Sequence, residues 1–230
     1  MRRRPFLRVL GQLALCCGPL LLWGRNSWAA IQRRLLPADT DIGNLAYEDP
    51  AELDTHLLPL TPVDQFGVSG LADHRIDPAQ WRLTLAGLVA HPRQLRLDPL
   101  RQRPPLTRNV LLICPGTFAY HARWQGFALW PLLQEAGLDP QATHVEISGP
   151  PEEGPEKARF TLDEIRREQV FLALAVNGQP LPVAHGFPLR VVAEGHVGAE
   201  WIKYVDRLEI VHAAVETTPK VRDDGAAFLP

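Results

Sequence analysis

The chain has 230 residues, of which 46% are apolar, and a formal net charge of −2 at pH 7. This length allows one sizeable domain with extensions, and the balance of charge argues against nucleic acid as a partner. The 22 prolines, 17 glycines and six tryptophans favour a loop-rich, strand-containing domain over a helical bundle.

Residues 1–30 are predicted to be an export signal. Several arginines precede an apolar run from Val9 to Trp23, and Ser27-Trp28-Ala29 resembles a cleavage site. The run has about 15 residues, fewer than the roughly 20 that cross a membrane, which favours a cleaved signal and leaves a membrane anchor as the alternative. The stretch from Arg3 to Arg8 resembles the twin-arginine consensus, which implies export of a folded protein to the periplasm.

Removal of this signal changes the character of the chain. It takes away five arginines and no acid, which leaves 19 basic against 26 acidic residues. It also takes away Cys16 and Cys17, so Cys114 becomes the only cysteine and no disulfide can form within the mature chain. Residues 31–60 show no sustained periodicity and are predicted to be an extension that wraps the body or links it to the membrane.

The body is predicted to begin with a loop over residues 61–78, which is rich in Gly, Asp and Pro. Residues 81–89 alternate between apolar and polar, which predicts a strand with one buried face, and Gly87 indicates a bulge in that strand. Residues 109–114 form a continuous apolar run that is typical of a fully buried strand. Pro115 and Gly116 end this strand.

The second half of the chain predicts short helices between further strands. Apolar residues at helical spacing predict a helix over 129–136 that ends at Gly137. Thr161 and Glu164 have the spacing of a capping box, and Asn177-Gly178 predicts a hairpin turn. Strands are expected at 143–149, 170–176, 187–195 and 201–212. The pattern predicts an α+β fold, rich in strands, and the absence of βαβ-length alternation argues against a doubly wound sheet.

The position of Cys114, at the end of a buried strand and directly before a turn, leaves three interpretations open. A buried core cysteine behaves as a small hydrophobic residue. A nucleophile needs a nearby base, for which His121, His185 and His196 are candidates, although the signatures of cysteine hydrolases are absent. A metal thiolate needs further ligands, so a single cysteine suffices only where an organic cofactor supplies the others.

Four segments in order resemble the molybdopterin-binding domain of the sulfite oxidase family. They are "TPVDQFGVSG", "WRLTLAGLVAHPRQLRLDPL", "LLICPGTFAYHARWQGFALWPLL" and "NGQPLPVAHGFPLRVVAEGHVGAEWIKYVDRLEIV". The resemblance implies a strand-rich sulfite-oxidase-type domain with short helices between mixed strands. It also implies one molybdenum–molybdopterin cofactor per chain, with Cys114 as the metal's thiolate ligand and as the catalytic residue.

The same resemblance implies which other residues bind the cofactor. Arg190 and Lys203 match basic residues that bind the pterin phosphate, where a buried phosphate needs charge-assisted partners. His185 and Ser148 match cofactor contacts, and Trp201 and Ile202 match residues whose backbone groups contact the phosphate. Contacts in the opening loop are expected at Asp64, Val68 and Ser69.

The sequence departs from the sulfite-oxidising members at two places. The opening loop is "FGVSGL" and the cysteine is followed by "PGTF", so the arginines that form an anion pocket are missing. Without them a sulfite dianion would lack its counter-charges. The chain is more similar to short exported bacterial members such as the periplasmic protein-methionine-sulfoxide reductases. Tyr120, His121, Arg123 and Trp124 are candidates for residues near the pocket that select the substrate.

We therefore expect a periplasmic molybdopterin oxidoreductase that acts by oxygen-atom transfer, with sulfoxide reduction favoured over sulfite oxidation. The expected domains are a signal at 1–30, an extension at 31–60, the molybdopterin domain at 61–213 and a tail at 214–230. The expected partners are a small-molecule or protein-bound oxo substrate and a membrane haem protein or cytochrome as electron donor, with a monomeric chain. The alternative is a non-catalytic exported binding protein that retains the fold.

Overall fold

The computed structural model describes residues 33–150 and 157–212. The predicted signal and tail therefore lie outside the described residues. The chain divides into two compact units, of which the first, Met1–Gln32, is not described and the second begins at Arg33. Within the described ranges no helix has the length and apolar character needed to cross a membrane.

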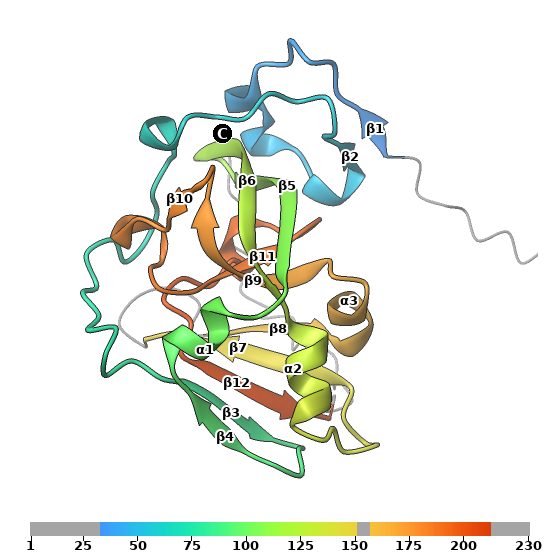
Figure 1. The fold of residues 1–230 in the computed structure, drawn as a ribbon. Coiled ribbons are helices and arrows are strands. Elements are labelled where there is room, and N and C mark those ends of the chain that lie inside the picture. Colours follow the sequence, from blue (N-terminus) through green and yellow to red (C-terminus); the bar gives the residue numbers. More distant parts are fainter. Residues whose placement is uncertain (1–32, 151–156, 213–230) are drawn as a thin grey trace, which may run out of the picture. The chain divides into compact units, whose positions relative to one another are not determined.

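The first of two five-stranded sheets is built around a long hairpin, and its strands are antiparallel (Figure 1). Its strands are β5 (Pro105–Cys114), β6 (Phe118–Ala128), β9 (Val170–Val176), β10 (Gln179–Pro180) and β11 (Arg190–Ala193). They are ordered β10-β9-β6-β5, and β11 also pairs with β9. The predicted end of β5 at Cys114 is confirmed, whereas β6 was not predicted.

The second sheet has the order β4-β3-β12-β7-β8. Its strands are β3 (Leu83–Gly87), β4 (Arg93–Leu95), β7 (His144–Ser148), β8 (Lys157–Thr161) and β12 (Arg207–Val211). The pairing of β3 with the parallel strand β12 runs to Gly87 opposite Ile210 without a register shift, so the expected bulge is wrong. Gly87 instead permits a close approach, because a Cβ there would lie 2.1 Å from the Ile210 carbonyl oxygen.

The helices are short, as predicted. They are α1 (Leu97–Arg101), α2 (Leu129–Glu135) and α3 (Leu162–Arg166), with the 3₁₀ turns η1 (Ile42–Tyr47), η2 (Pro50–Glu52), η3 (Val63–Gln65), η4 (Val183–His185) and η5 (Gly198–Glu200). Helix α2 is followed by Gly137 at φ +69°, and Thr161 and Glu164 form the expected capping box of α3. The predicted strand-rich α+β class is confirmed.

One cluster of buried apolar side chains joins the two sheets. It includes Leu112 of β5, Leu85 of β3 and Leu208 of β12, together with the buried face of α2. Cys114 and Phe118 are partly buried and pack against the same cluster. The tip of the β5–β6 hairpin is therefore anchored on the main core, which fixes the position of Cys114.

The segment before residue 60 packs against the other face of β5. Strands β1 (Arg34–Leu35) and β2 (Leu53–Asp54) are paired in parallel, and a second apolar cluster joins Leu45 and Leu58 to Leu111 and Ile113 of the hairpin. In Figure 1 this blue segment lies beside the end of the hairpin. The part of β5 from Val110 to Ile113 is consequently buried on both faces.

Candidate functional site

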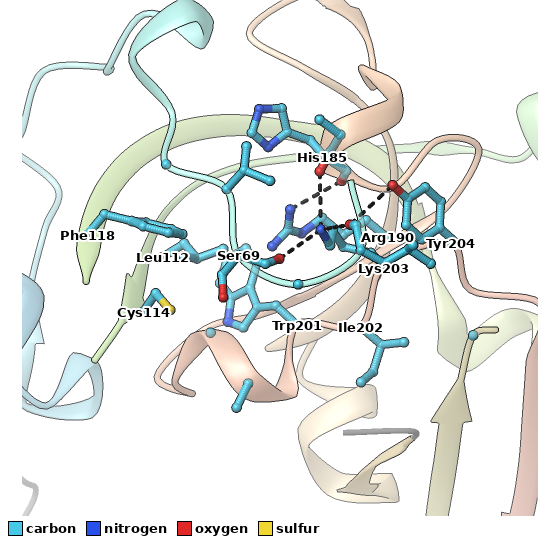
Figure 2. Close-up of a pocket in the computed structure, with 18 of the residues that line it drawn as sticks. Ser69, Leu112, Cys114, Phe118, His185, Arg190, Trp201, Ile202, Lys203 and Tyr204 are labelled. Carbon is cyan, nitrogen blue, oxygen red and sulfur yellow. Dashed lines mark hydrogen bonds between the residues drawn. The ribbon is translucent and has the colours of Figure 1, made fainter. Parts of the chain in front are cut away.

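A pocket of about 250 Å³ lies at the tip of the β5–β6 hairpin (Figure 2). Four further segments complete its wall: the loop 67–71, the residues after β7 at 149–150, the turn at 184–185 with Arg190 of β11, and the segment 198–204 between β11 and β12. These segments are far apart in the sequence. The pocket therefore exists only in the folded domain.

Cys114 faces this pocket because residues of a strand alternate between its two faces. Leu112 and Cys114 share one face and line the pocket, whereas Leu111 and Ile113 belong to the cluster on the other face. Gly198 packs directly against the cysteine, since a Cβ at that position would lie 3.3 Å from the Cys114 Cα. The thiol is half-buried and forms no disulfide.

The surroundings of Cys114 weigh against a hydrolytic role. His121 pairs with Leu111 on the opposite face of the hairpin, and its Nδ1 lies 3.2 Å from the Pro59 carbonyl oxygen. His196 is held by Glu164 and Glu200, at 2.9 and 3.1 Å. Of the three candidate bases only His185 lines the pocket, and within the described ranges no histidine forms a hydrogen bond to the thiol.

Arg190 brings a buried positive charge to the pocket, with only 5% of its surface exposed. Its Nη1 donates a hydrogen bond to the His185 carbonyl oxygen at 3.2 Å, and its guanidinium carbon lies 5.5 Å from the Trp124 ring centre and 5.8 Å from that of Trp201. Its Nε has no hydrogen-bond partner among the described residues. Such an orphaned donor on a buried cation indicates a missing anionic partner.

Lys203 lies beside Arg190 and holds the opening loop. Its Nζ donates to the carbonyl oxygens of Ser69 at 2.9 Å and Ala184 at 3.3 Å, and also to that of Leu71 (Figure 2). Gly186 permits this packing, because a Cβ there would lie 3.0 Å from the Lys203 Cβ. The lysine therefore connects three segments of the pocket wall.

His185 adds a third basic group. Burial, followed by the charges of Arg190 and Lys203, lowers its pKa to about 4. The imidazole is consequently neutral at pH 7, and the fixed positive charges are those of Arg190 and Lys203. Among the described residues that line the pocket there is no Asp or Glu, so the pocket favours an anionic ligand at this end.

Eight of the ten residues predicted for the site line the pocket: Val68, Ser69, Cys114, His185, Arg190, Trp201, Ile202 and Lys203. Asp64 and Ser148 do not. Asp64 lies in η3, ahead of the lining loop, and Ser148 is paired within the sheet to Arg207 and Lys157, so the neighbouring Gly149 lines the pocket instead. The amides of Trp201 and Ile202 already donate to the Gly198 and Glu200 carbonyl oxygens.

The four hairpin residues expected near the pocket are divided between the two faces of β6. Tyr120 lines the pocket, and Trp124 is buried behind it against Arg190. His121 and Arg123 belong to the other face, where His121 is fully buried and Arg123 is exposed. Only Tyr120 of the four is therefore placed to contact a ligand.

Several lining residues were missed. Gly67, Gly198 and Tyr204 all contribute to the wall, and Tyr204 has φ +56° with its hydroxyl donating to the Leu71 carbonyl oxygen at 3.3 Å. The glycines stood in the segments that carried the family resemblance, where close approach is their usual role. Nothing in the sequence around Tyr204 indicates its backbone conformation.

Comparison with known proteins assigns this arrangement to a family. Residues 70–218 match the model of the oxidoreductase molybdopterin binding domain, which is well over half of the chain. The chain belongs to this family. It is 30% identical over 208 residues to the catalytic subunit of the protein-methionine-sulfoxide reductase MsrP of Gluconobacter oxydans, covering 75% of this chain and 66% of that protein.

Two further members of the family show how far the likeness extends. A sulfite oxidase of Arabidopsis thaliana is 30% identical over 191 residues, covering 66% of this chain and 48% of its own. The crystal structure of the sulfane dehydrogenase SoxCD from Paracoccus pantotrophus superimposes with a TM-score of 0.57 at 26% identity, over 63% of this chain and 41% of that one. The chain thus spans about half to two thirds of the length of the curated relatives named here.

The residues of the pocket fit a molybdopterin cofactor. No group of three or more His, Cys, Asp or Glu side chains in the described residues could hold a metal ion, so a metal at Cys114 would need its other ligands from a non-protein group. The orphaned Nε of Arg190 provides a donor for a phosphate, and the positive charge of the nearby Lys203 favours an anion there. A thiol at one end, with the buried Arg190 and the partly buried Lys203 at the other, corresponds to the two ends of such a cofactor.

Proposed function

We propose that this protein is a molybdenum–molybdopterin oxidoreductase that reduces sulfoxides, as small molecules or within proteins. The observation that carries the proposal is the division of the pocket. Cys114 lies at an end lined by Leu112, Pro115 and Phe118, and the positive charges of Arg190 and Lys203 lie at the other end. An uncharged oxo substrate suits the first end, and the cofactor's phosphate suits the second.

One cofactor per chain is expected, because Cys114 is the sole predicted metal ligand. In this proposal the Cys114 thiolate binds the metal, and Arg190 and Lys203 bind the phosphate. The remaining predicted contacts to the cofactor that line the pocket are Val68, Ser69, His185, Trp201 and Ile202, whereas Asp64 and Ser148, predicted as contacts as well, lie outside its lining. When bound, the cofactor supplies two-electron and oxygen-atom-transfer chemistry, while the protein positions it and excludes competing reactions.

The reaction is a reductive cleavage of an S–O bond. The sulfoxide takes up two electrons and two protons, and the products are a thioether and water. Sulfite oxidation is less well supported, because no arginine or lysine lies among the lining residues around Cys114 to balance a dianion. The reductase named among the relatives agrees with the direction proposed for this chain.

The electrons require a donor outside the described residues. We assign this role to a membrane haem protein or cytochrome, since the chain is proposed to act in the periplasm after twin-arginine export, or to remain anchored there if the signal is not cleaved. The active form is proposed to be a monomer. No role in nucleic-acid binding is proposed, because acidic residues exceed basic ones once the signal is removed.

The test is a reductase assay on protein purified from a host that makes the cofactor. Reduced viologen dye serves as the electron source for dimethyl sulfoxide and methionine sulfoxide, and ferricyanide serves as the electron acceptor in a parallel assay with sulfite. Wild-type protein is expected to oxidise the dye with both sulfoxides, and Cys114→Ser is expected to lose this activity with its circular dichroism spectrum unchanged. Cofactor-loaded wild-type protein that turns over none of these substrates would favour the non-catalytic binding protein.

A further inference from the structure

The ring of Phe118 stands directly opposite Cys114. The two residues are paired in register across the β5–β6 hairpin, and opposite residues of an antiparallel pair place their side chains on the same face of the sheet. Both line the pocket. Figure 2 shows Phe118 and Cys114 together on one side, away from Arg190, Lys203 and Tyr204. Whatever approaches the thiol end of the pocket therefore meets this ring.

Its neighbours hold the Phe118 ring in one place. It stacks on Tyr120 with 5.8 Å between ring centres and 17° between planes, and Tyr120 stacks in turn on Phe66 at 4.1 Å and 10°. On the loop side the ring lies against the backbone of Gly67, where a Cβ would come within 2.2 Å of its Cγ. The ring is therefore a preorganised wall rather than a mobile side chain.

The chemistry of this end is apolar. Leu112, Pro115 and Ala199 surround the thiol and the ring, and the described lining residues there carry no charge. The free energy of a contact with an aromatic ring depends on the apolar area that it removes from water. A neutral sulfoxide with a sizeable apolar substituent gains from this wall, whereas an anion loses its hydration without a counter-charge.

We propose that Phe118 is a specificity-determining residue, which selects sulfoxides bearing an apolar substituent and disfavours oxyanions. This inference rests on the proposed function, because it concerns the substrate of the same site. It assigns to Gly67 and Tyr120 the role of positioning the ring. Phe118 takes no part in the chemical step, so its removal should affect binding of the substrate more than the rate of turnover.

The test compares two sulfoxides that differ in their apolar group, methyl p-tolyl sulfoxide and dimethyl sulfoxide, on cofactor-loaded protein. Phe118→Ala is expected to raise the KM of the tolyl substrate about tenfold and that of dimethyl sulfoxide about twofold at most, because only the tolyl group reaches the ring. The kcat values should stay close to those of the wild type. Gly67→Ala displaces the ring without changing residue 118. It should also raise the KM of the tolyl substrate relative to that of dimethyl sulfoxide.

A binding measurement separates this inference from the proposed function. Calorimetric affinities of methyl p-tolyl sulfone, which resembles the sulfoxide, and of sulfate are measured for wild type, Phe118→Ala and Phe118→Arg. We expect sulfone binding to weaken about tenfold in both variants, and sulfate binding to strengthen in Phe118→Arg alone. Tyr47→Ala is the matched control, since it removes an aromatic ring that is 85% exposed and outside the pocket lining.

The possible results are distinct. If Phe118→Ala weakens both sulfoxides equally, or leaves the tolyl sulfone unaffected while the wild type reduces sulfoxides, the inference is wrong and the proposed function stands. If the tolyl sulfone depends on Phe118 but loaded wild-type protein reduces no sulfoxide, the aromatic wall stands and the proposed function fails. If Tyr47→Ala weakens sulfone binding as much as Phe118→Ala does, the effect is not specific to Phe118 and the inference is wrong.

Discussion

Arg190 carries its charge into the domain without a carboxylate partner among the described residues. A buried cation costs free energy unless paired, and the cation–aromatic contacts to Trp124 and Trp201 offset only part of that cost. Arg190 therefore lowers the stability of the cofactor-free domain. Binding of an anion next to its guanidinium offsets this cost, which is expected of a ligand-binding residue and not of a core residue.

Replacement of Arg190 by Met should therefore separate stability from binding. We expect cofactor-free Arg190→Met to unfold within about 1 kcal/mol of the wild type or to be more stable, because the isolated buried charge is removed. The same variant should retain far less pterin after purification. Urea unfolding and pterin fluorescence measure the two effects, with the exposed Arg123→Met as the control. Destabilisation by several kcal/mol with unchanged pterin content would show that Arg190 is structural.

His185 makes stability depend on pH in a defined window. Its folded pKa of about 4 lies below the usual value of 6.5, because of burial and then the charges of Arg190 and Lys203. Above pH 6.5 the histidine is mostly neutral in both the folded and the unfolded chain, so its protonation does not change the free energy of unfolding. As the pH falls from 6.5 towards 4 the unfolded chain binds the proton more readily, so stability is lost, by roughly 3 kcal/mol at most.

His185→Gln in the cofactor-free protein should lose this dependence. The slope of unfolding free energy between pH 6.5 and 5 is expected to be smaller than in the wild type, whereas the exposed His91→Gln should keep the wild-type slope. The window lies above the range in which carboxylates such as Glu135 and Glu146, whose pKa values are lowered by arginine and lysine partners, begin to matter. An unchanged slope in His185→Gln would contradict the buried, neutral state described for this residue.

At the scale of elements, the β5–β6 hairpin shows what local patterns could and could not predict. The end of β5 was predictable, because its apolar run stops at Pro115-Gly116. Strand β6 was not, because the three consecutive residues Tyr120, His121 and Ala122 are all buried and a register shift at Gln125 and Gly126 interrupts its alternation. The segment before residue 60 covers the second face of the hairpin near its tip. Its packing there depends on contacts between residues far apart in the sequence, which a short stretch of sequence does not reveal.

This cover over the hairpin can be tested at Ile113, which is fully buried in the second cluster. Ile113→Ala should destabilise the protein by about 2–5 kcal/mol, because it leaves a cavity between β5 and the segment 33–58. Protease cleavage within 33–58 should also become faster. Leu35→Ala, at a residue that is 50% exposed, is the control and should change stability little. Equal protease sensitivity in the two variants would mean that this cluster does not hold the segment.

At the scale of the whole domain, the pocket is assembled from segments between Gly67 and Tyr204. The family resemblance predicted most of its lining, since the motifs that carried the resemblance are the segments that meet there. It could not predict that Ser148 would be paired within the sheet and that Gly149 would line the pocket in its place. That difference of one residue follows from strand register, which is fixed by the pairing of β7 with β12 and β8.

A site built from the entire domain has a consequence for export. The cofactor's proposed ligands come together only when both sheets and the loop 67–71 are in place, so loading requires a folded chain. A route that carries folded proteins, as proposed for this signal, allows loading to precede export. The proposed order of events, in which the cofactor is loaded before export, requires that the protein binds the molybdenum cofactor.

That claim is tested most directly by elemental analysis for molybdenum, together with fluorescence of the released, oxidised pterin, on protein purified from a host that makes the cofactor. We predict about one molybdenum and about one pterin per chain, since the described residues offer a single thiol and a single cationic end. Protein that is folded and contains neither would contradict the claim, and would leave Cys114 as an ordinary thiol at the mouth of an anion-binding pocket.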